Sequence, residues 1–193
     1  MKRKILLTLL IISFTLTSSA LASSTFSIGV GSFTPKDDVM SSFDTGYTVT
    51  ASYVTAASDL FAYGVDLAFN QTEATGKIGV FEDKVTLSTL GLEALIYIQP
   101  KDAKVQPFVG AGIGLYVNNL NAKLNNVEYF DDSGSGFGFV GKAGLRLFLD
   151  NKFYIGGYGK YYSNDQDFEN YDKSKTTHNL GGTCFVFEIG LKL

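Results

Sequence analysis

From about residue 24 onwards, the chain alternates between apolar residues and polar or small residues over eight separate stretches. The last stretch, Thr183–Leu193, shows this most clearly, because every second residue from Phe185 to Leu193 is large and apolar. A period of two is that of a β-strand, in which successive side chains point to opposite faces. The eight predicted strands are Thr25–Phe33, Gly46–Val54, Leu60–Asn70, Val85–Gln99, Lys104–Asn118, Phe137–Leu149, Phe153–Tyr162 and Thr183–Leu193.

The connections between these strands alternate in length. Three are short (Thr55–Ser58, Pro100–Ala103 and Asp150–Lys152), whereas those after the first, third, fifth and seventh strands are long and polar. An even number of strands joined in this way is typical of barrels in the bacterial outer membrane. The terminal strand also needs a neighbour on each edge, and pairing with the first strand would close the sheet. We therefore predict an all-β fold, an eight-stranded antiparallel up-and-down transmembrane β-barrel with short periplasmic turns and longer extracellular loops.

The parity opposite to the apolar one is rich in glycine and carries charges of both signs. A soluble eight-stranded barrel such as a lipocalin would give the same alternation, with its apolar parity turned inward. We would expect many more charges per strand on the surface of a soluble barrel. Aromatic residues also gather toward the strand ends, as they do at membrane interfaces. The pattern therefore favours a barrel in lipid with a polar lumen.

Six charged residues are predicted to form a cluster inside this lumen: Asp66, Glu93, Lys142, Arg146, Lys160 and Glu188. Counting residues from the periplasmic turns places five of them in one layer near the middle of the membrane, with Arg146 below it. An eight-stranded barrel is only just wide enough for side chains to fill it. Three acids facing three bases can pair there as a plug, whereas a charge buried alone would be costly. The alternative is six independently solvated residues in a water-filled tube.

The N-terminal residues have the layout of a secretory signal peptide. A basic start, Lys2–Lys4, precedes an apolar run that begins at Ile5, and the small residues Ala20-Leu21-Ala22 follow. The run is shorter than the roughly 20 apolar residues of a transmembrane helix. The expected organisation is a signal peptide over residues 1–22 and an outer-membrane β-barrel domain over residues 23–193, exported to the cell outer membrane.

Composition and charge agree with this prediction. The chain has 21 glycines, only three prolines, no tryptophan, 16 phenylalanines and 11 tyrosines. Removal of residues 1–22 would take away three basic residues and lower the net charge from −3 to −6. Nucleic acid is therefore not an expected partner. The lone Cys184 cannot form an internal disulfide.

Three segments carry a resemblance to a known family: Phe26–Pro35 (FSIGVGSFTP), Gln106–Tyr116 (QPFVGAGIGLY) and Lys142–Arg146 (KAGLR). They resemble the bacterial outer-membrane β-barrel domain family, which includes the OmpA, OmpX, OmpW and opacity-protein barrels. The resemblance covers residues 25–193 and is specific for architecture. It implies no single function, because the family includes adhesins, small-solute channels and envelope-stabilising proteins.

Catalytic, cofactor and metal sites are not indicated. Gly110, Gly112 and Gly114 lack the Gly-Lys-Ser/Thr sequence of a phosphate-binding loop and more simply leave room for lumen tyrosines. Lipid-A deacylases resemble this barrel in size but need a His-x-Ser pair, and Leu180 occupies the serine position after His178. One histidine and one cysteine are too few ligands for a transition-metal site.

Two acidic stretches, 128–135 and 164–172, are interpreted as solvated extracellular loops. The alternative is that they share divalent cations with lipopolysaccharide phosphates.

We therefore expect a non-enzymatic outer-membrane protein without a cofactor, with a structural or adhesin-like role carried by its extracellular loops. A passive channel for small or hydrophobic solutes is the alternative, and a lipid-modifying enzyme is a third possibility. The expected partners are outer-membrane lipid and lipopolysaccharide, the barrel-assembly machinery and an extracellular ligand, with the protein itself a monomer.

Overall fold

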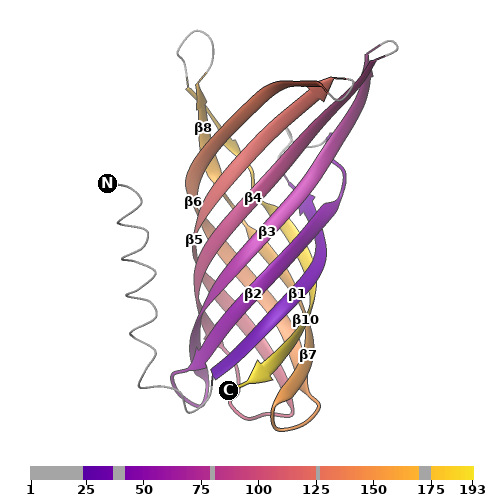
Figure 1. Cartoon of the computed structure of the whole chain (residues 1–193). Coiled ribbons are helices and arrows are strands. Elements are labelled where there is room, and N and C mark those ends of the chain that lie inside the picture. The colour runs from indigo at the N-terminus through magenta and orange to yellow at the C-terminus, as the bar shows by residue number, and fades with distance from the viewer. Residues whose placement is uncertain (1–23, 37–41, 79–80, 125–126, 170–174) are drawn as a thin grey trace.

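A computed structural model of the chain describes residues 24–36, 42–78, 81–124, 127–169 and 175–193. Eight strands form one closed antiparallel barrel in the order β1-β10-β7-β6-β5-β4-β3-β2, and β8 pairs with β9 in a separate two-stranded sheet. Figure 1 shows the barrel with tilted strands and the short turns gathered at one end. The predicted signal peptide, residues 1–22, lies outside the described residues.

The barrel strands differ in length. Four are short: β1 Ser24–Pro35, β2 Gly46–Ala56, β7 Phe153–Tyr162 and β10 Gly182–Lys192. Four neighbouring strands are long: β3 Phe61–Ile78, β4 Phe81–Ile98, β5 Val105–Leu124 and β6 Val127–Phe148. The extra sheet comprises β8, Asp165–Glu169, and β9, Lys175–Asn179.

The first and last strands close the barrel, as predicted. In their antiparallel ladder Phe26 is the register partner of Leu191, and Gly29 is the partner of Glu188. The backbone N–H of Leu193 also donates to the carbonyl of Ser24. No barrel strand is therefore left with an open edge over the height at which the short strands are present.

The apolar parity faces outward. Ile28 and Phe187 are 52% and 56% exposed, whereas the lumen-facing Asp66 and Glu93 are 1% and 0% exposed. A soluble barrel would show the opposite distribution, so the lipocalin alternative is contradicted. No helix within the described ranges is long and apolar enough to cross a membrane.

Three segments predicted as loops contain strands instead. The expected loop Gln71–Lys84 lies largely within β3 and β4, and the expected loop Asn119–Ser135 lies largely within β5 and β6. The prediction ended each strand where apolar alternation stops. Outside the membrane neither face needs to be apolar, so the backbone ladder continues through polar residues. The loop expected at Ser163–Asn179 likewise contains β8 and β9.

The periplasmic turns are held by short side chains. Asp150 Oδ1 accepts hydrogen bonds from the backbone N–H groups of Lys152, at 2.6 Å, and Phe153, at 2.7 Å. Both hydrogen bonds lower the pKa of the Asp150 carboxyl group, and the bond from the Phe153 N–H has the larger effect. Ser58 Oγ similarly accepts from the N–H of Phe61 at 3.1 Å. Asp102, in the β4–β5 turn, has a φ of 58°, a left-handed conformation that aspartate tolerates better than most residues.

Candidate functional site: the lumen and the extracellular wall

All six charged residues predicted for the lumen lie inside the barrel and are at most 2% exposed. They come from five strands: Asp66 on β3, Glu93 on β4, Lys142 and Arg146 on β6, Lys160 on β7, and Glu188 on β10. We call this set the charge layer. Each of these residues lies on the parity opposite to the lipid-facing one, so strand alternation alone turns it inward.

Like charges are neighbours within each wall of the barrel. Asp66 is the register partner of Glu93, and Lys142 is the register partner of Lys160. Like charges directly opposite one another in a sheet are destabilising. They are compensated across the lumen, where Lys142 Nζ lies 2.9 Å from Asp66 Oδ2 and Lys160 Nζ lies 2.9 Å from Glu93 Oε1. The two ion pairs therefore connect β3 and β4, which carry the acids, with β6 and β7, which carry the lysines, across the lumen.

The third ion pair joins Arg146 to Glu188. Arg146 Nε lies 2.8 Å from Glu188 Oε1, and Ser27 Oγ donates to Glu188 Oε2 at 3.0 Å. Arg146 Nη1 donates to Gln99 Oε1 at 3.0 Å, and the guanidinium carbon lies 4.4 Å from the centre of the Phe108 ring. Glu188, which the count from the turns predicts in the layer of five, thus pairs with Arg146, which the count predicts below that layer.

Aromatic rings fill much of the remaining lumen. Tyr116 and Tyr162 stack with their centroids 5.0 Å apart, and Tyr116 donates to Glu93 Oε1 at 3.2 Å. Lys142 Nζ lies 3.8 Å from the centre of the Tyr158 ring, a cation–π contact. A Cβ at Gly110 would lie only 2.6 Å from the Tyr97 ring, in agreement with the interpretation that this glycine leaves room for a lumen tyrosine.

A second buried polar layer contains only neutral side chains. We call it the amide layer; its members are Asn70, Thr89, Asn118, Asn164 and Gln166. Asn118 Oδ1 accepts from Thr89 Oγ1 at 2.8 Å and from Asn164 Nδ2 at 3.0 Å. Asn118 Nδ2 donates to Gln166 Oε1 at 2.6 Å. Asn70 connects this layer to the aromatic rings, because its Nδ2 donates to Tyr162 Oη at 3.1 Å.

The amide layer is not predicted by the sequence pattern, because Asn164 and Gln166 lie in a segment expected to be a solvated loop. Glycines on β6 explain their inward course: a Cβ at Gly134 would lie 1.7 Å from the Gln166 side chain, and one at Gly138 would lie 1.6 Å from the Ser163 carbonyl. Only residues without side chains on β6 leave room for the segment from Ser163 to Gln166 at this place. The alternating glycines at 134, 136 and 138 were the available signal.

The four long strands extend past the ends of the short ones and form what we call the extracellular wall. It comprises residues 72–78 of β3, 81–87 of β4, 120–124 of β5 and 127–139 of β6. The ladder of β2 with β3 ends at the Tyr47–Gln71 pair, and that of β6 with β7 ends at the Val140–Tyr162 pair. Figure 1 shows these strands rising above the rest of the barrel on one side.

Other candidate chemistry stays sparse. Among the described residues, no group of three or more His, Cys, Asp or Glu side chains could hold a metal ion. Cys184 is a free, buried thiol whose Sγ donates to Asn70 Oδ1 at 3.8 Å. The acidic side chains of Asp131, Asp132 and Asp167 lie outside the part whose side chains are described.

Comparisons with known proteins agree with this architecture. The family model for the outer membrane protein beta-barrel domain matches residues 6–183. A search of curated proteins finds no match. OprG from Pseudomonas aeruginosa has a TM-score of 0.63 at 12% identity, with 89% of this chain and 96% of that chain covered. Neisserial surface protein A has a TM-score of 0.59 at 13% identity, with 89% and 97% covered.

The Yersinia pestis attachment invasion locus protein, Ail, in complex with the heparin analogue sucrose octasulfate, has a TM-score of 0.52 at 17% identity, with 89% and 98% covered. At these identities the likeness concerns the fold. The family match, in contrast, spans most of the sequence, so the chain belongs to the outer membrane protein beta-barrel domain family and is an outer-membrane β-barrel.

Proposed function

We propose that this barrel is a non-enzymatic surface protein that binds an extracellular ligand through its extracellular wall. The observation that carries the proposal is the difference in strand length. The four strands of the wall have 18 to 22 residues, whereas the other four have 10 to 12. A tilted strand needs only about 9–11 residues to cross a bilayer. The wall is therefore more structure than anchoring in the membrane requires.

The wall offers backbone and apolar groups for contact. In the described part of the chain, residues 74–78 of β3 and 127–135 of β6 have a ladder partner on only one side. Below them the edges are covered, because the Glu73 carbonyl accepts from Asp44 N–H and the Phe139 carbonyl accepts from Ser163 N–H. Val127 of β6 is 68% exposed and Leu124 of β5 is 37% exposed. Open strand edges and exposed apolar side chains are both features that proteins use to bind partners. Ail, whose name refers to attachment and invasion, has this fold and is seen in complex with a heparin analogue, which is consistent with a ligand-binding role for such a barrel.

The lumen supports a closed barrel better than the alternative of a passive channel. Three ion pairs and the stacked rings of Tyr116 and Tyr162 occupy its interior. An eight-stranded barrel has little width beyond what its own side chains fill. A large steady conductance of the unmodified protein in planar bilayers would favour the channel and contradict the closed barrel.

Export and partners complete the proposal. Residues 1–22 act as a signal peptide cleaved after Ala22, and residues 23–193 insert through the barrel-assembly machinery. Leu193, the residue after β10, lies on the lipid-facing parity and is 57% exposed. In the membrane the protein is a monomer surrounded by lipid and lipopolysaccharide.

The test is to shorten the wall without opening the barrel. Residues 73–86 are replaced by Asn-Gly, which joins the register partners Thr72 and Leu87 in a two-residue hairpin. In a second variant, residues 121–131 are replaced in the same way between the partners Leu120 and Asp132. Cells that display each variant are then tested for binding to immobilised sulfated polysaccharides and matrix proteins.

The matched control shortens β8 and β9 instead, with Asn-Gly between the partners Asp167 and Thr177. We expect binding by the full chain and by this control, and its loss in both wall variants. Heat-dependent mobility on gels verifies that each barrel has folded. Binding that survives removal of both parts of the wall would contradict the proposal.

A further inference from the structure

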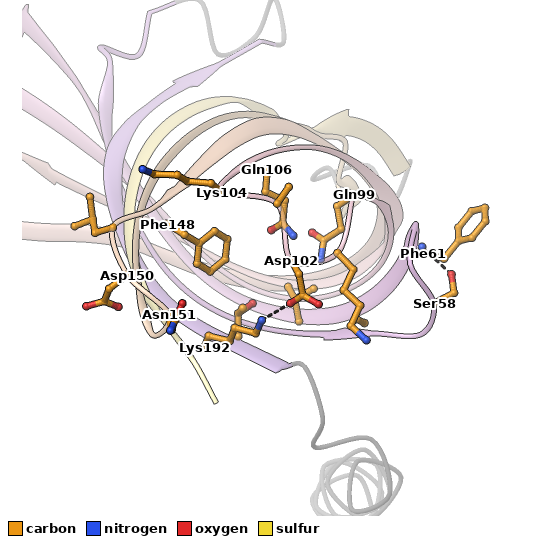
Figure 2. A pocket seen from close by; sticks show the side chains of 16 residues that line it. Ser58, Phe61, Gln99, Asp102, Lys104, Gln106, Phe148, Asp150, Asn151 and Lys192 are labelled. Carbon is orange, nitrogen blue, oxygen red and sulfur yellow. Dashed lines mark hydrogen bonds and ion pairs between the residues drawn. The ribbon is translucent and has the colours of Figure 1, made fainter.

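The periplasmic end of the barrel contains a cavity of about 520 Å³ that is separate from the extracellular wall. It opens between the short turns, and we call it the vestibule. Figure 2 looks into it and shows the side chains of Gln99 and Gln106 projecting into the opening, with Lys192 reaching across to Asp102. The vestibule ends blindly, because Gln99 at its inner end is bonded to Arg146 of the charge layer.

The inner end of the vestibule carries hydrogen-bonding groups with unused capacity. Gln106 is 5% exposed; its Nε2 donates to the Pro100 carbonyl at 2.6 Å, while its Oε1 has no partner in the protein. Gln99 uses its Oε1 to accept from Arg146, which leaves its amide N–H groups for another acceptor. Buried polar groups nearly always have a partner. A ligand that fits here offers an N–H to Gln106 and an acceptor to Gln99.

The rim carries an excess of positive charge. Three lysines line the vestibule, Lys101, Lys104 and Lys192, against two aspartates. Asp102 is paired with Lys192, and Asp150 accepts from two backbone N–H groups of its own turn. Within the described part of the chain, neither Lys101 nor Lys104 forms an ion pair. The mouth therefore favours an anion that approaches from the periplasm.

The walls between rim and inner end are apolar, with Val54, Ala56, Ala103 and Phe148 in the lining. A carboxylate next to an N–H, with a small apolar side chain between them, is the chemistry of the end of a peptide. We propose that the vestibule binds the carboxyl terminus of a short peptide in the periplasm. The carboxylate accepts from the Gln99 amide at the inner end, and the last peptide N–H donates to Gln106 Oε1. The rim lysines Lys101, Lys104 and Lys192 attract the anion into the opening.

The proposal is tested on the full mature barrel in detergent micelles or nanodiscs, by calorimetry and by NMR chemical-shift changes. The probe is N-acetyl-alanyl-alanine with a free carboxylate, and the matched control ligand is the same dipeptide with its terminus amidated. We expect saturable binding of the acid and binding of the amide weaker by about tenfold or more, because hydrogen bonds to a charged group are the stronger ones. This comparison needs no mutation.

Two substitutions locate the site. Lys192→Gln removes one of the three lysines at the opening and should weaken binding of the acid by about tenfold. Lys152→Gln removes a lysine of a neighbouring periplasmic turn that does not line the vestibule, and should leave binding unchanged. Absence of saturable binding, equal binding of acid and amide, or an equal effect of both substitutions would each overturn the proposal.

Discussion

The charge layer and the amide layer are both buried polar structures inside one barrel, yet they are built differently. In the charge layer each acid has one principal base on another strand, as for Lys142 with Asp66 at 2.9 Å. In the amide layer one residue, Asn118, is shared by Thr89, Asn164 and Gln166. Loss of one charge leaves a buried ion without compensation, whereas loss of one amide leaves neutral groups that can find other partners. The ion pairs of the charge layer therefore fix the strands relative to one another, whereas the hydrogen bonds of the amide layer can rearrange.

The largest effect is expected from Glu93→Gln, which leaves Lys160 without its ionic partner at a site where both residues are at most 2% exposed. Removal of one member of a buried ion pair costs about 3–5 kcal/mol. The measurement is the free energy of unfolding in urea, with the protein in lipid vesicles.

Two controls isolate the buried charge. The double variant Glu93→Gln/Lys160→Met should recover part of the loss, because no lone charge remains. Glu73→Gln breaks the ion pair with Lys84, whose side chains are 40% and 44% exposed, and should cost less than about 1 kcal/mol. Equal losses in Glu93→Gln and Glu73→Gln would remove the distinction between buried and exposed pairs.

A second substitution in the charge layer should change the conductance of the barrel. Lys142→Met leaves Asp66 and Glu93 side by side with Lys160 as the one remaining base of the two cross-lumen pairs. Repulsion between the two carboxylates should loosen the contact of β3 and β4 with β6 and β7 across the lumen. We expect brief opening events in planar bilayers for this variant and little steady conductance for the unmodified protein. Lys84→Met, on the extracellular wall, serves as the control and should behave like the unmodified protein.

The amide layer should be less sensitive. Asn118→Leu removes the shared partner of three side chains, and loss of such neutral hydrogen bonds costs about 1–3 kcal/mol. Hydrogen exchange should show faster opening of β8, because Gln166 is held by Asn118 at 2.6 Å. An unfolding penalty as large as that of Glu93→Gln would mean that the two layers do not differ as proposed.

The smallest effect is expected at the periplasmic mouth, outside the membrane. A hydrogen bond from Lys192 lowers the pKa of Asp102 below its ordinary value of 3.8. The stabilisation is therefore present above that value and is lost as the pH falls through the lowered pKa. Unfolding measured from neutral to acidic pH should show a small advantage of the unmodified protein over Asp102→Asn that disappears in acid. An advantage that grows in acid would have the wrong sign.

Local pattern was enough to predict the barrel strands, because a lipid-facing residue such as Ile28 must alternate with a lumen-facing one such as Gly29. The same alternation predicts that the six charged residues face the lumen. It could not predict the wall, since the apolar period of β3 disappears beyond Asn70 although its ladder with β4 continues. Nor could it predict the amide layer, because the inward course of Asn164 depends on glycines of β6 distant in sequence. Pairing of Glu188 with Arg146 likewise depends on side-chain reach across strands.

The stacked tyrosines also have an optical consequence. Tyr116 and Tyr162 lie with ring centroids 5.0 Å apart and an interplanar angle of 20°, and the chain contains no tryptophan. Rings fixed this closely give near-ultraviolet circular dichroism that is lost when tertiary packing is lost. Insertion and closure of this barrel can therefore be followed by its own tyrosine signal, without a label. A single tryptophan introduced at any position would be the only indole emitter in the molecule.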